Sequence, residues 1–277
     1  MSDWHLTDTF HSTSGDVRWG SLGTPGRDTV VLLHGTPFSS YVWRAVARAI
    51  AGSHQVFVWD MPGYGTSEKS ASQDVSLAAQ ARVFSELLSH WDLDQPLVVA
   101  HDFGGAVSLR AHLLHGARYR ALALVDPVAL APWGSPFFRL VGEHSAVFEQ
   151  LPPALHRALV REYVSSASSP GLHPAVLDRL TQPWLGELGQ AAFYRQIAQA
   201  DQCHTDEVQD RYGEIGFPTL VCWGEHDTWI PLAKGRELVT RIPGARLHPI
   251  AGAGHLVQED APAELTAALM AFLHQQR

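Results

Sequence analysis

The chain contains little cysteine and no long hydrophobic run. Cys203 and Cys222 are its two cysteines, too few for a disulfide framework, and no Cys-x-x-Cys or Cys/His pattern indicates structural zinc. No apolar run approaches the roughly 18 residues of a membrane-spanning helix. Gly and Pro are scattered, which excludes collagen-like and low-complexity chains. With 277 residues, 45% of them hydrophobic, the chain is long enough to bury one large core.

Basic residues are also in the minority. Lys and Arg number 20 against 28 Asp and Glu, which gives a formal net charge of −8. An excess of negative charge argues against a broad phosphate-binding surface, so we expect no nucleic-acid partner. The segment Met1–His5 lacks a basic stretch followed by an apolar one. We therefore expect no signal peptide, no membrane partner and a cytoplasmic location.

Short apolar runs recur along the chain and end in turns that contain glycine or aspartate. Stretches with helical spacing lie between them, including residues 77–90 and a stretch that ends at Leu114. Buried strands that alternate with helices predict an α/β fold, with a mostly parallel sheet and helices on both faces. The predicted strands are residues 29–33, 55–59, 97–100, 121–125, 219–223 and 246–250.

This rhythm changes between residues 128 and 213. Helical spacing dominates there, proline interrupts it repeatedly, and no strand is evident before the strand–helix pattern resumes at Phe217. We therefore predict that residues 1–127 and 214–277 form the α/β core. Residues 128–213 are predicted to form a helical lid at the carboxyl edge of the sheet, where open α/β folds bind their ligands.

Asp102 lies at the centre of a turn flanked by small residues. The segment Ala100-His101-Asp102-Phe103-Gly104 follows a predicted strand and precedes a predicted helix. Small residues at both ends allow a sharp turn that lifts the central side chain into a pocket, the geometry called a nucleophile elbow. Asp also caps helices well, but the complete strand–turn–helix context favours a nucleophile.

Two later strand ends carry an acid and a histidine. Asp227 follows the strand at 219–223, and His255 follows the strand at 246–250. The chain order nucleophile, acid, histidine is that of an α/β-hydrolase triad. Asp126 lies at the end of the strand before the lid and is the alternative acid for orienting the histidine. Its other predicted role is to cap a turn that leads into the lid.

On these residues the sequence resembles the α/β-hydrolases of the group that contains haloalkane dehalogenases and epoxide hydrolases. His34–Arg44 is similar to the dehalogenase oxyanion segment, and His101–Gly105 resembles the elbow of both families. The resemblance covers nearly the whole chain and is weakest in the lid. It implies an α/β-hydrolase fold with a helical lid, and a hydrolase that needs neither a metal nor another cofactor.

An Asp nucleophile implies a reaction in two steps. The Asp102 carboxylate displaces a leaving group at a saturated carbon and forms an alkyl ester on the enzyme. Water activated by His255 then attacks the carbonyl carbon of this ester, while Asp227 holds the imidazole in the required tautomer. We expect the backbone N–H groups of Thr36 and Phe103 to form the oxyanion hole.

The sequence specifies the leaving group less well. Halide release needs N–H donors near the nucleophile, but Phe103 has none, and Trp133 in the lid is as typical of packing as of halide binding. Opening an epoxide ring needs an acid, normally a lid tyrosine. Phe193-Tyr194-Arg195 resembles the lid segment that carries one, so Tyr194 is the predicted donor, with a core aromatic as its alternative role.

The sequence therefore favours an epoxide hydrolase for a small to medium apolar substrate, since the lid is rich in Phe, Leu and Trp. A haloalkane dehalogenase-like hydrolase of carbon–halogen bonds is the alternative with the same covalent intermediate. A ligand-sensing protein on a hydrolase scaffold is the alternative from another class. The expected partner is a small-molecule substrate, and we expect a monomer or a homodimer.

Overall fold

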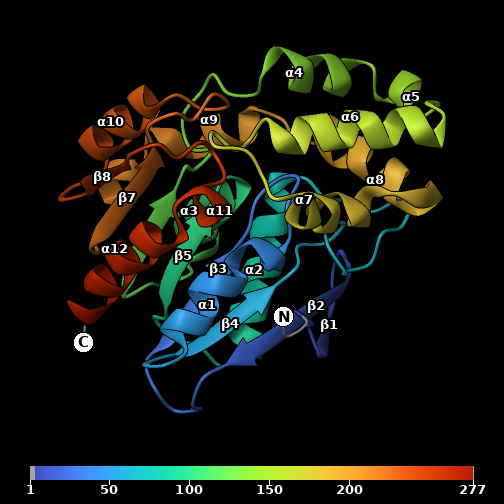
Figure 1. The fold of residues 1–277 in the computed structure, drawn as a ribbon. Helices are drawn as coiled ribbons and strands as arrows, with labels where there is room; N and C mark the ends of the chain where they lie inside the picture. Colours follow the sequence, from blue (N-terminus) through green and yellow to red (C-terminus); the bar gives the residue numbers. More distant parts are fainter. Residues whose placement is uncertain (1–3, 277) are drawn as a thin grey trace.

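The computed structural model describes residues 4–276, so Met1–Asp3, part of the segment used to predict the absence of a signal peptide, lie outside it. Within this range an eight-stranded sheet has the order β1-β2-β4-β3-β5-β6-β7-β8 (Figure 1). β1 pairs antiparallel with β2, β2 pairs antiparallel with β4, and the later pairings are parallel. The strands are β1 (Asp8–Ser12), β2 (Gly15–Leu22), β3 (Thr29–Leu33), β4 (Gln55–Trp59), β5 (Leu97–His101), β6 (Ala121–Val125), β7 (Thr219–Gly224) and β8 (Arg246–Ile250).

Helices lie on both faces of the sheet, as the sequence predicts. In Figure 1, α1 and α12 lie in front of the strands, and α2 and α3 lie behind them. No helix within residues 4–276 is both long and apolar enough to cross a membrane. The helices are α1 (Arg44–Ile50), α2 (Leu77–His90), α3 (Phe103–His115), α4 (Pro136–Glu143), α5 (Ser145–Phe148), α6 (Pro153–Ser165), α7 (Pro174–Thr181), α8 (Gly186–Ala198), α9 (Cys203–Gln209), α10 (Leu232–Arg241), α11 (Val257–Asp260) and α12 (Pro262–His274), with short 3-10 helices η1 (Ser40–Trp43), η2 (Gln182–Trp184) and η3 (Tyr212–Glu214).

The central strands are apolar throughout because both of their faces are covered. Every residue of β5, β6 and β7 is buried, which is typical of parallel strands between two helical layers. The six predicted strands correspond to β3 through β8, each within one residue at its ends. The β1–β2 hairpin was not predicted, because its residues are largely polar and partly exposed.

Helices replace strands between β6 and β7, where the sequence predicts a lid. In the described chain this interval contains α4 through α9, and we refer to α4–α8 as the lid helices. They lie along the end of the sheet where the parallel strands finish (Figure 1). The Trp184 indole N–H donates to the Pro37 carbonyl at 2.6 Å, which ties the lid helices to the loop after β3. The boundaries at residues 127 and 213 stay predictions.

Close packing at the start of α3 leaves no room for a side chain at Gly104. A Cβ atom there would lie 2.6 Å from the His34 carbonyl oxygen and 2.8 Å from the Leu33 Cβ atom. We expect Gly104→Ala to lower the free energy of unfolding by about 1–3 kcal/mol, because backbone atoms must shift. The control is Gly142→Ala in α4, where the added Cβ would have its nearest contact at 3.8 Å. Equal melting temperatures for the two variants would contradict this packing argument.

Candidate active site

Asp102 occupies a strained turn between β5 and α3. Its φ and ψ angles are 50° and −117°, a conformation that costs a non-glycine residue on the order of 1–3 kcal/mol. The surroundings admit the carboxylate only because Gly35 has no side chain, since a Cβ there would lie 2.3 Å from Asp102 Oδ1. Asp102 is only 3% exposed. The turn therefore presents a buried carboxylate at the edge of the sheet.

One oxygen of this carboxylate is held by the loop after β3. The Thr36 backbone N–H donates to Asp102 Oδ1 at 2.6 Å. Among the described residues, the Phe103 N–H makes no hydrogen bond to the carboxylate, although Phe103 begins α3 directly after Asp102. The structure thus brings Thr36 to the predicted oxyanion position, and Phe103 supplies the adjoining helix N-terminus, whose dipole favours negative charge.

His255 lies between the two predicted carboxylates. Its Nε2 atom is 3.4 Å from Asp102 Oδ2, and its Nδ1 atom is 2.8 Å from Asp227 Oδ2. The other oxygen of Asp227 accepts the backbone N–H groups of Trp229 and Ile230 at 2.8 and 2.9 Å. Asp227 is therefore fixed in place and bonded to the ring nitrogen opposite Asp102, which is the arrangement that orients a catalytic imidazole.

The charges in this row of side chains raise the pKa of His255. Burial alone would lower it, but the negative charge of Asp227 and the hydrogen bonds to Asp102 and Asp227 outweigh burial and raise the pKa well above its ordinary value. His101, which packs beside His255, shows the opposite result. Burial and the nearby His255 lower its pKa to about 3, so its neutral ring donates Nε2–H to the His255 carbonyl oxygen at 3.0 Å.

Asp126 lies next to the Asp102–His255–Asp227 row but makes no hydrogen bond to His255 among the described residues. It is fully buried, and its Oδ1 atom accepts the Gly224 N–H at 2.9 Å. Its carboxylate lies within 4.8 Å of the ligand atoms of Asp227 and His255. Burial and the charge of Asp227 raise its pKa well above the ordinary value. Asp227 holds the Nδ1 contact, so Asp126 lies beside Asp227 as a buried carboxyl whose raised pKa favours its protonated form.

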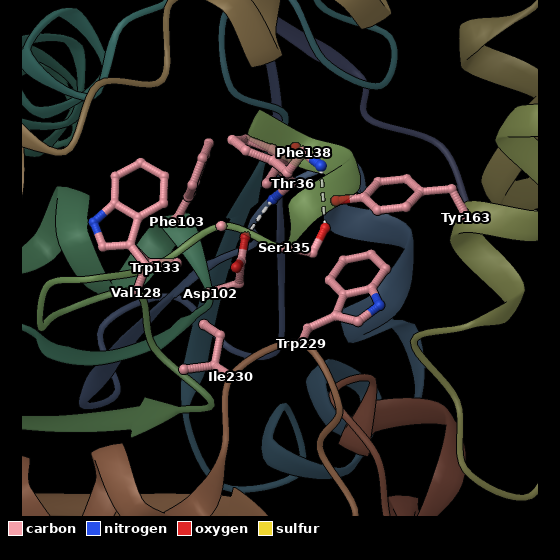
Figure 2. A pocket seen from close by; sticks show the side chains of 11 residues that line it. Thr36, Asp102, Phe103, Val128, Trp133, Ser135, Phe138, Tyr163, Trp229 and Ile230 are labelled. Carbon is pink, nitrogen blue, oxygen red and sulfur yellow. Dashed lines mark hydrogen bonds between the residues drawn. The ribbon is translucent and has the colours of Figure 1, made fainter. Parts of the chain in front are cut away.

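A small cavity adjoins Asp102 beneath the lid helices. Its volume is about 30 Å³, and aromatic rings from the lid and the loop after β7 enclose it (Figure 2). Space of this size accommodates a group of a few heavy atoms at the carboxylate. The lining residues are Thr36, Asp102, Phe103, Val128, Trp133, Gly134, Ser135, Phe138, Tyr163, Trp229 and Ile230.

The structure does not bring Tyr194, the predicted proton donor, to this cavity. Tyr194 is fully buried among the lid helices, and its hydroxyl group lies 2.9 Å from His156 Nδ1. The His156 ring is bonded on its other side to the Trp184 carbonyl at 2.8 Å. Tyr194 therefore has its alternative predicted role, a packed core aromatic.

Tyr163 lines the cavity instead, although the sequence did not single it out. Figure 2 shows its hydroxyl group pointing into the space above Asp102. Burial and the charge of Asp102 raise its pKa well above the ordinary value, so the phenol keeps its proton. The signal was present in the sequence, because Tyr163 falls on the face of α6 that buries His156, Val160 and Val164.

Two tryptophans of the cavity wall direct their N–H groups elsewhere. The Trp133 indole donates to Thr205 Oγ1 at 2.8 Å, and the Trp229 indole donates to Ser166 Oγ at 3.0 Å. Neither N–H group is thus available to a leaving group at Asp102. The structure accordingly does not support Trp133 as a halide donor.

Two groups of side chains in the described chain could be compared with metal sites. One group consists of Asp126, Asp227 and His255. In it, His255 Nδ1 and Asp227 Oδ2, two atoms that could bind a metal, are already hydrogen-bonded to each other. Cys203, His204 and Glu207 form the other. There the Arg110 guanidinium donates to Glu207 Oε2 at 2.7 Å and supplies the positive charge that a cation would bring. We assign a metal to neither group.

Comparison with known proteins identifies the family of the fold. Residues 28–262 match the profile of the family described as alpha/beta hydrolase fold. A solved structure of an alpha/beta hydrolase fold protein from Burkholderia ambifaria is 46% identical, with a TM-score of 0.93 over 97% of this chain and 98% of that one.

Curated relatives are more distant but also match nearly end to end. The uncharacterized hydrolase YugF of Bacillus subtilis is 25% identical over 93% of this chain and 94% of its own length. Haloalkane dehalogenase 2 of Mycobacterium bovis is 26% identical over 94% of this chain and 92% of its own length. With the family profile covering most of the chain, the protein belongs to the alpha/beta hydrolase fold family.

Proposed function

We propose that this protein is an epoxide hydrolase with Asp102 as its nucleophile. The observation that carries the proposal is the carboxylate at the elbow, with Oδ1 held by Thr36 and Oδ2 beside His255 at the small cavity. A carboxylate in this place can form an ester with a saturated carbon. The names of the relatives YugF and haloalkane dehalogenase 2 support hydrolysis as the reaction class.

In the first step, Asp102 Oδ2 attacks a carbon of the oxirane ring. A carbon–oxygen bond of the ring breaks as the new ester bond forms, and the ring oxygen takes the phenolic proton of Tyr163. Tyr163 carries its proton near neutral pH, since its pKa is raised from an ordinary value that already lies above that range. Ester formation also removes the negative charge of Asp102, which is one cause of that raised pKa, so the phenolate is better tolerated once the ring has opened.

In the second step, His255 acts as the base. Esterification removes the negative charge of Asp102, which is one of the causes that raise the pKa of His255. The pKa of His255 therefore falls, and the neutral ring can accept a proton from water. As this pKa falls, the proton leaves His255 Nε2 and passes to the Tyr163 phenolate, which becomes a neutral phenol again. Hydroxide then adds to the ester carbonyl carbon, and the Thr36 N–H stabilises the oxyanion. The ester bond breaks, the diol oxygen takes the proton from His255, and the regenerated Asp102 carboxyl passes its own proton to His255, which restores the starting state.

Hydrolysis of a carbon–halogen bond is the second candidate. The similarity to haloalkane dehalogenase 2 favours it, because an Asp ester serves both reactions. The cavity argues for the epoxide, since Tyr163 offers an O–H group there while the Trp133 and Trp229 N–H groups are bonded elsewhere.

Replacement of the cavity tyrosine tests the proposed function. We expect the wild-type protein to hydrolyse terminal epoxides, and Tyr163→Phe to lower kcat about a hundredfold, because the departing ring oxygen loses its acid. Tyr194→Phe is the matched control and should keep the wild-type kcat, since Tyr194 contacts His156 rather than the cavity. Initial rates on propylene oxide at a temperature where all three proteins are folded provide the measurement.

Other rate patterns would contradict the proposal. Equal rates for the wild-type protein and Tyr163→Phe would remove Tyr163 from ring opening. Turnover of haloalkanes without turnover of epoxides would replace the proposed function by dehalogenation.

The buried carboxyl of Asp126 leads to a pH-dependent prediction. The unfolded chain ionises Asp126 above about pH 4, whereas the folded protein retains the proton because its pKa is raised. Stability due to Asp126 therefore falls as pH rises above about 4. We expect Asp126→Asn, which is uncharged in both states, to raise the melting temperature at neutral pH and to change it little near pH 4.

Activity separates Asp126 from Asp227 in the same set of variants. Asp126→Asn should keep kcat/KM within about threefold of wild type, because an amide replaces a protonated acid. Asp227→Asn should lower it about 10³- to 10⁴-fold, because the imidazole loses its required tautomer. A folded Asp126→Asn protein without activity would instead identify Asp126 as the residue that orients His255.

A further inference from the structure

A second cavity lies outside the one at Asp102. Its volume is about 370 Å³, it is open to solvent, and it is bordered by the start of α4, the second half of α6 and the loop after β7. We call it the outer cavity. The residues that line it are Ser135, Phe137, Leu159, Glu162, Tyr163, Ser166, Thr228 and Trp229.

The outer cavity adjoins the catalytic one through shared walls. Ser135, Tyr163 and Trp229 line both. The Tyr163 and Trp229 rings stack with centroids 4.5 Å apart, and their planes are inclined by 12°. Figure 2 shows both rings and the short Ser135 side chain at the rim of the catalytic cavity. The two cavities therefore meet at these three side chains.

The two volumes differ in what they can hold. The catalytic cavity of about 30 Å³ has room for the reacting atoms and little more. The outer cavity of about 370 Å³ lies within the range of ordinary small-molecule sites. A substrate that fills both therefore has a small reacting end and a larger remainder.

The residues that line the outer cavity indicate what kind of group this larger remainder of the substrate is. Phe137 packs against Tyr163 with ring centroids 5.1 Å apart, and Leu159 adds an aliphatic surface. The Ser166 hydroxyl already accepts the Trp229 indole N–H. None of the residues that line the cavity is Lys, Arg or His, and the one charged residue, Glu162, is exposed. Such a wall suits an uncharged apolar group and disfavours a carboxylate or a phosphate.

We propose that the outer cavity binds the apolar tail of the substrate whose reacting end lies at Asp102. The inference rests on the proposed function and narrows the substrate class to terminal epoxides that carry an uncharged alkyl or aryl group. The unsubstituted oxirane carbon faces Asp102 Oδ2, and the tail passes Ser135 into the outer cavity. Leu159 is then a residue that determines specificity without contacting the reacting atoms.

Filling the outer cavity tests this proposal. We expect Leu159→Trp to raise the KM for decene oxide about tenfold or more, because the tail loses its apolar site, and to change the KM for propylene oxide, which has no long tail, much less. The matched control is Leu155→Trp. Leu155 lies one turn earlier on α6, is 58% exposed and does not line the cavity. That control should keep the wild-type KM for both epoxides.

Binding of octanol provides a readout that needs no turnover. We expect calorimetry to detect octanol binding to the wild-type protein and to Leu155→Trp, and to show at least about tenfold weaker binding to Leu159→Trp. Unchanged octanol affinity in Leu159→Trp, or equal KM values for decene oxide and propylene oxide in the wild-type protein, would overturn the tail site. Octanol binding that Leu159→Trp abolishes, without hydrolysis of any epoxide, would support the cavity and contradict the proposed function alone.

Discussion

The hydrogen bond from the Thr36 N–H to Asp102 Oδ1 is the contact on which the rest of the site depends. It forms at 2.6 Å because Asp102 adopts a strained backbone conformation and Gly35 leaves room for the carboxylate. With one oxygen held there, the other oxygen lies 3.4 Å from His255 Nε2. The same contact serves both proposed steps, since it directs Oδ2 toward a substrate and later stabilises the oxyanion of the ester.

Negative charge around His255 determines which of the two proposed steps comes first. Asp102 and Asp227 together raise the pKa of His255, and burial together with the charge of Asp227 raises the pKa of the third acid, Asp126. Formation of an ester removes one of the two charges that hold the proton on His255. The chemical state of Asp102 therefore determines whether His255 is a cation or a base, and Tyr163 responds to the same charge.

The catalytic row could be predicted from the sequence because parallel strands end at one edge of a sheet. Asp102, Asp227 and His255 each follow a strand whose apolar residues are recognisable, so their proximity follows from the fold. The proton donor could not be predicted in this way. Tyr163 and Tyr194 both lie on buried helix faces, and only the packing of α6 against α8 determines that Tyr194 meets His156 while Tyr163 faces Asp102. The choice between Asp126 and Asp227 likewise depends on the loop that brings Trp229 and Ile230 to Asp227.

Intact-protein mass spectrometry of a His255→Gln variant tests the central claim most directly. Without its base the variant should complete the first step and stall before the second, so the ester on Asp102 accumulates. After exposure to propylene oxide we expect a mass increase equal to one whole epoxide molecule, located on Asp102 by peptide mapping. The double variant His255→Gln, Asp102→Asn should remain unmodified. If wild-type protein hydrolyses the epoxide while His255→Gln gains no mass, or gains it at another residue, the covalent role of Asp102 is contradicted.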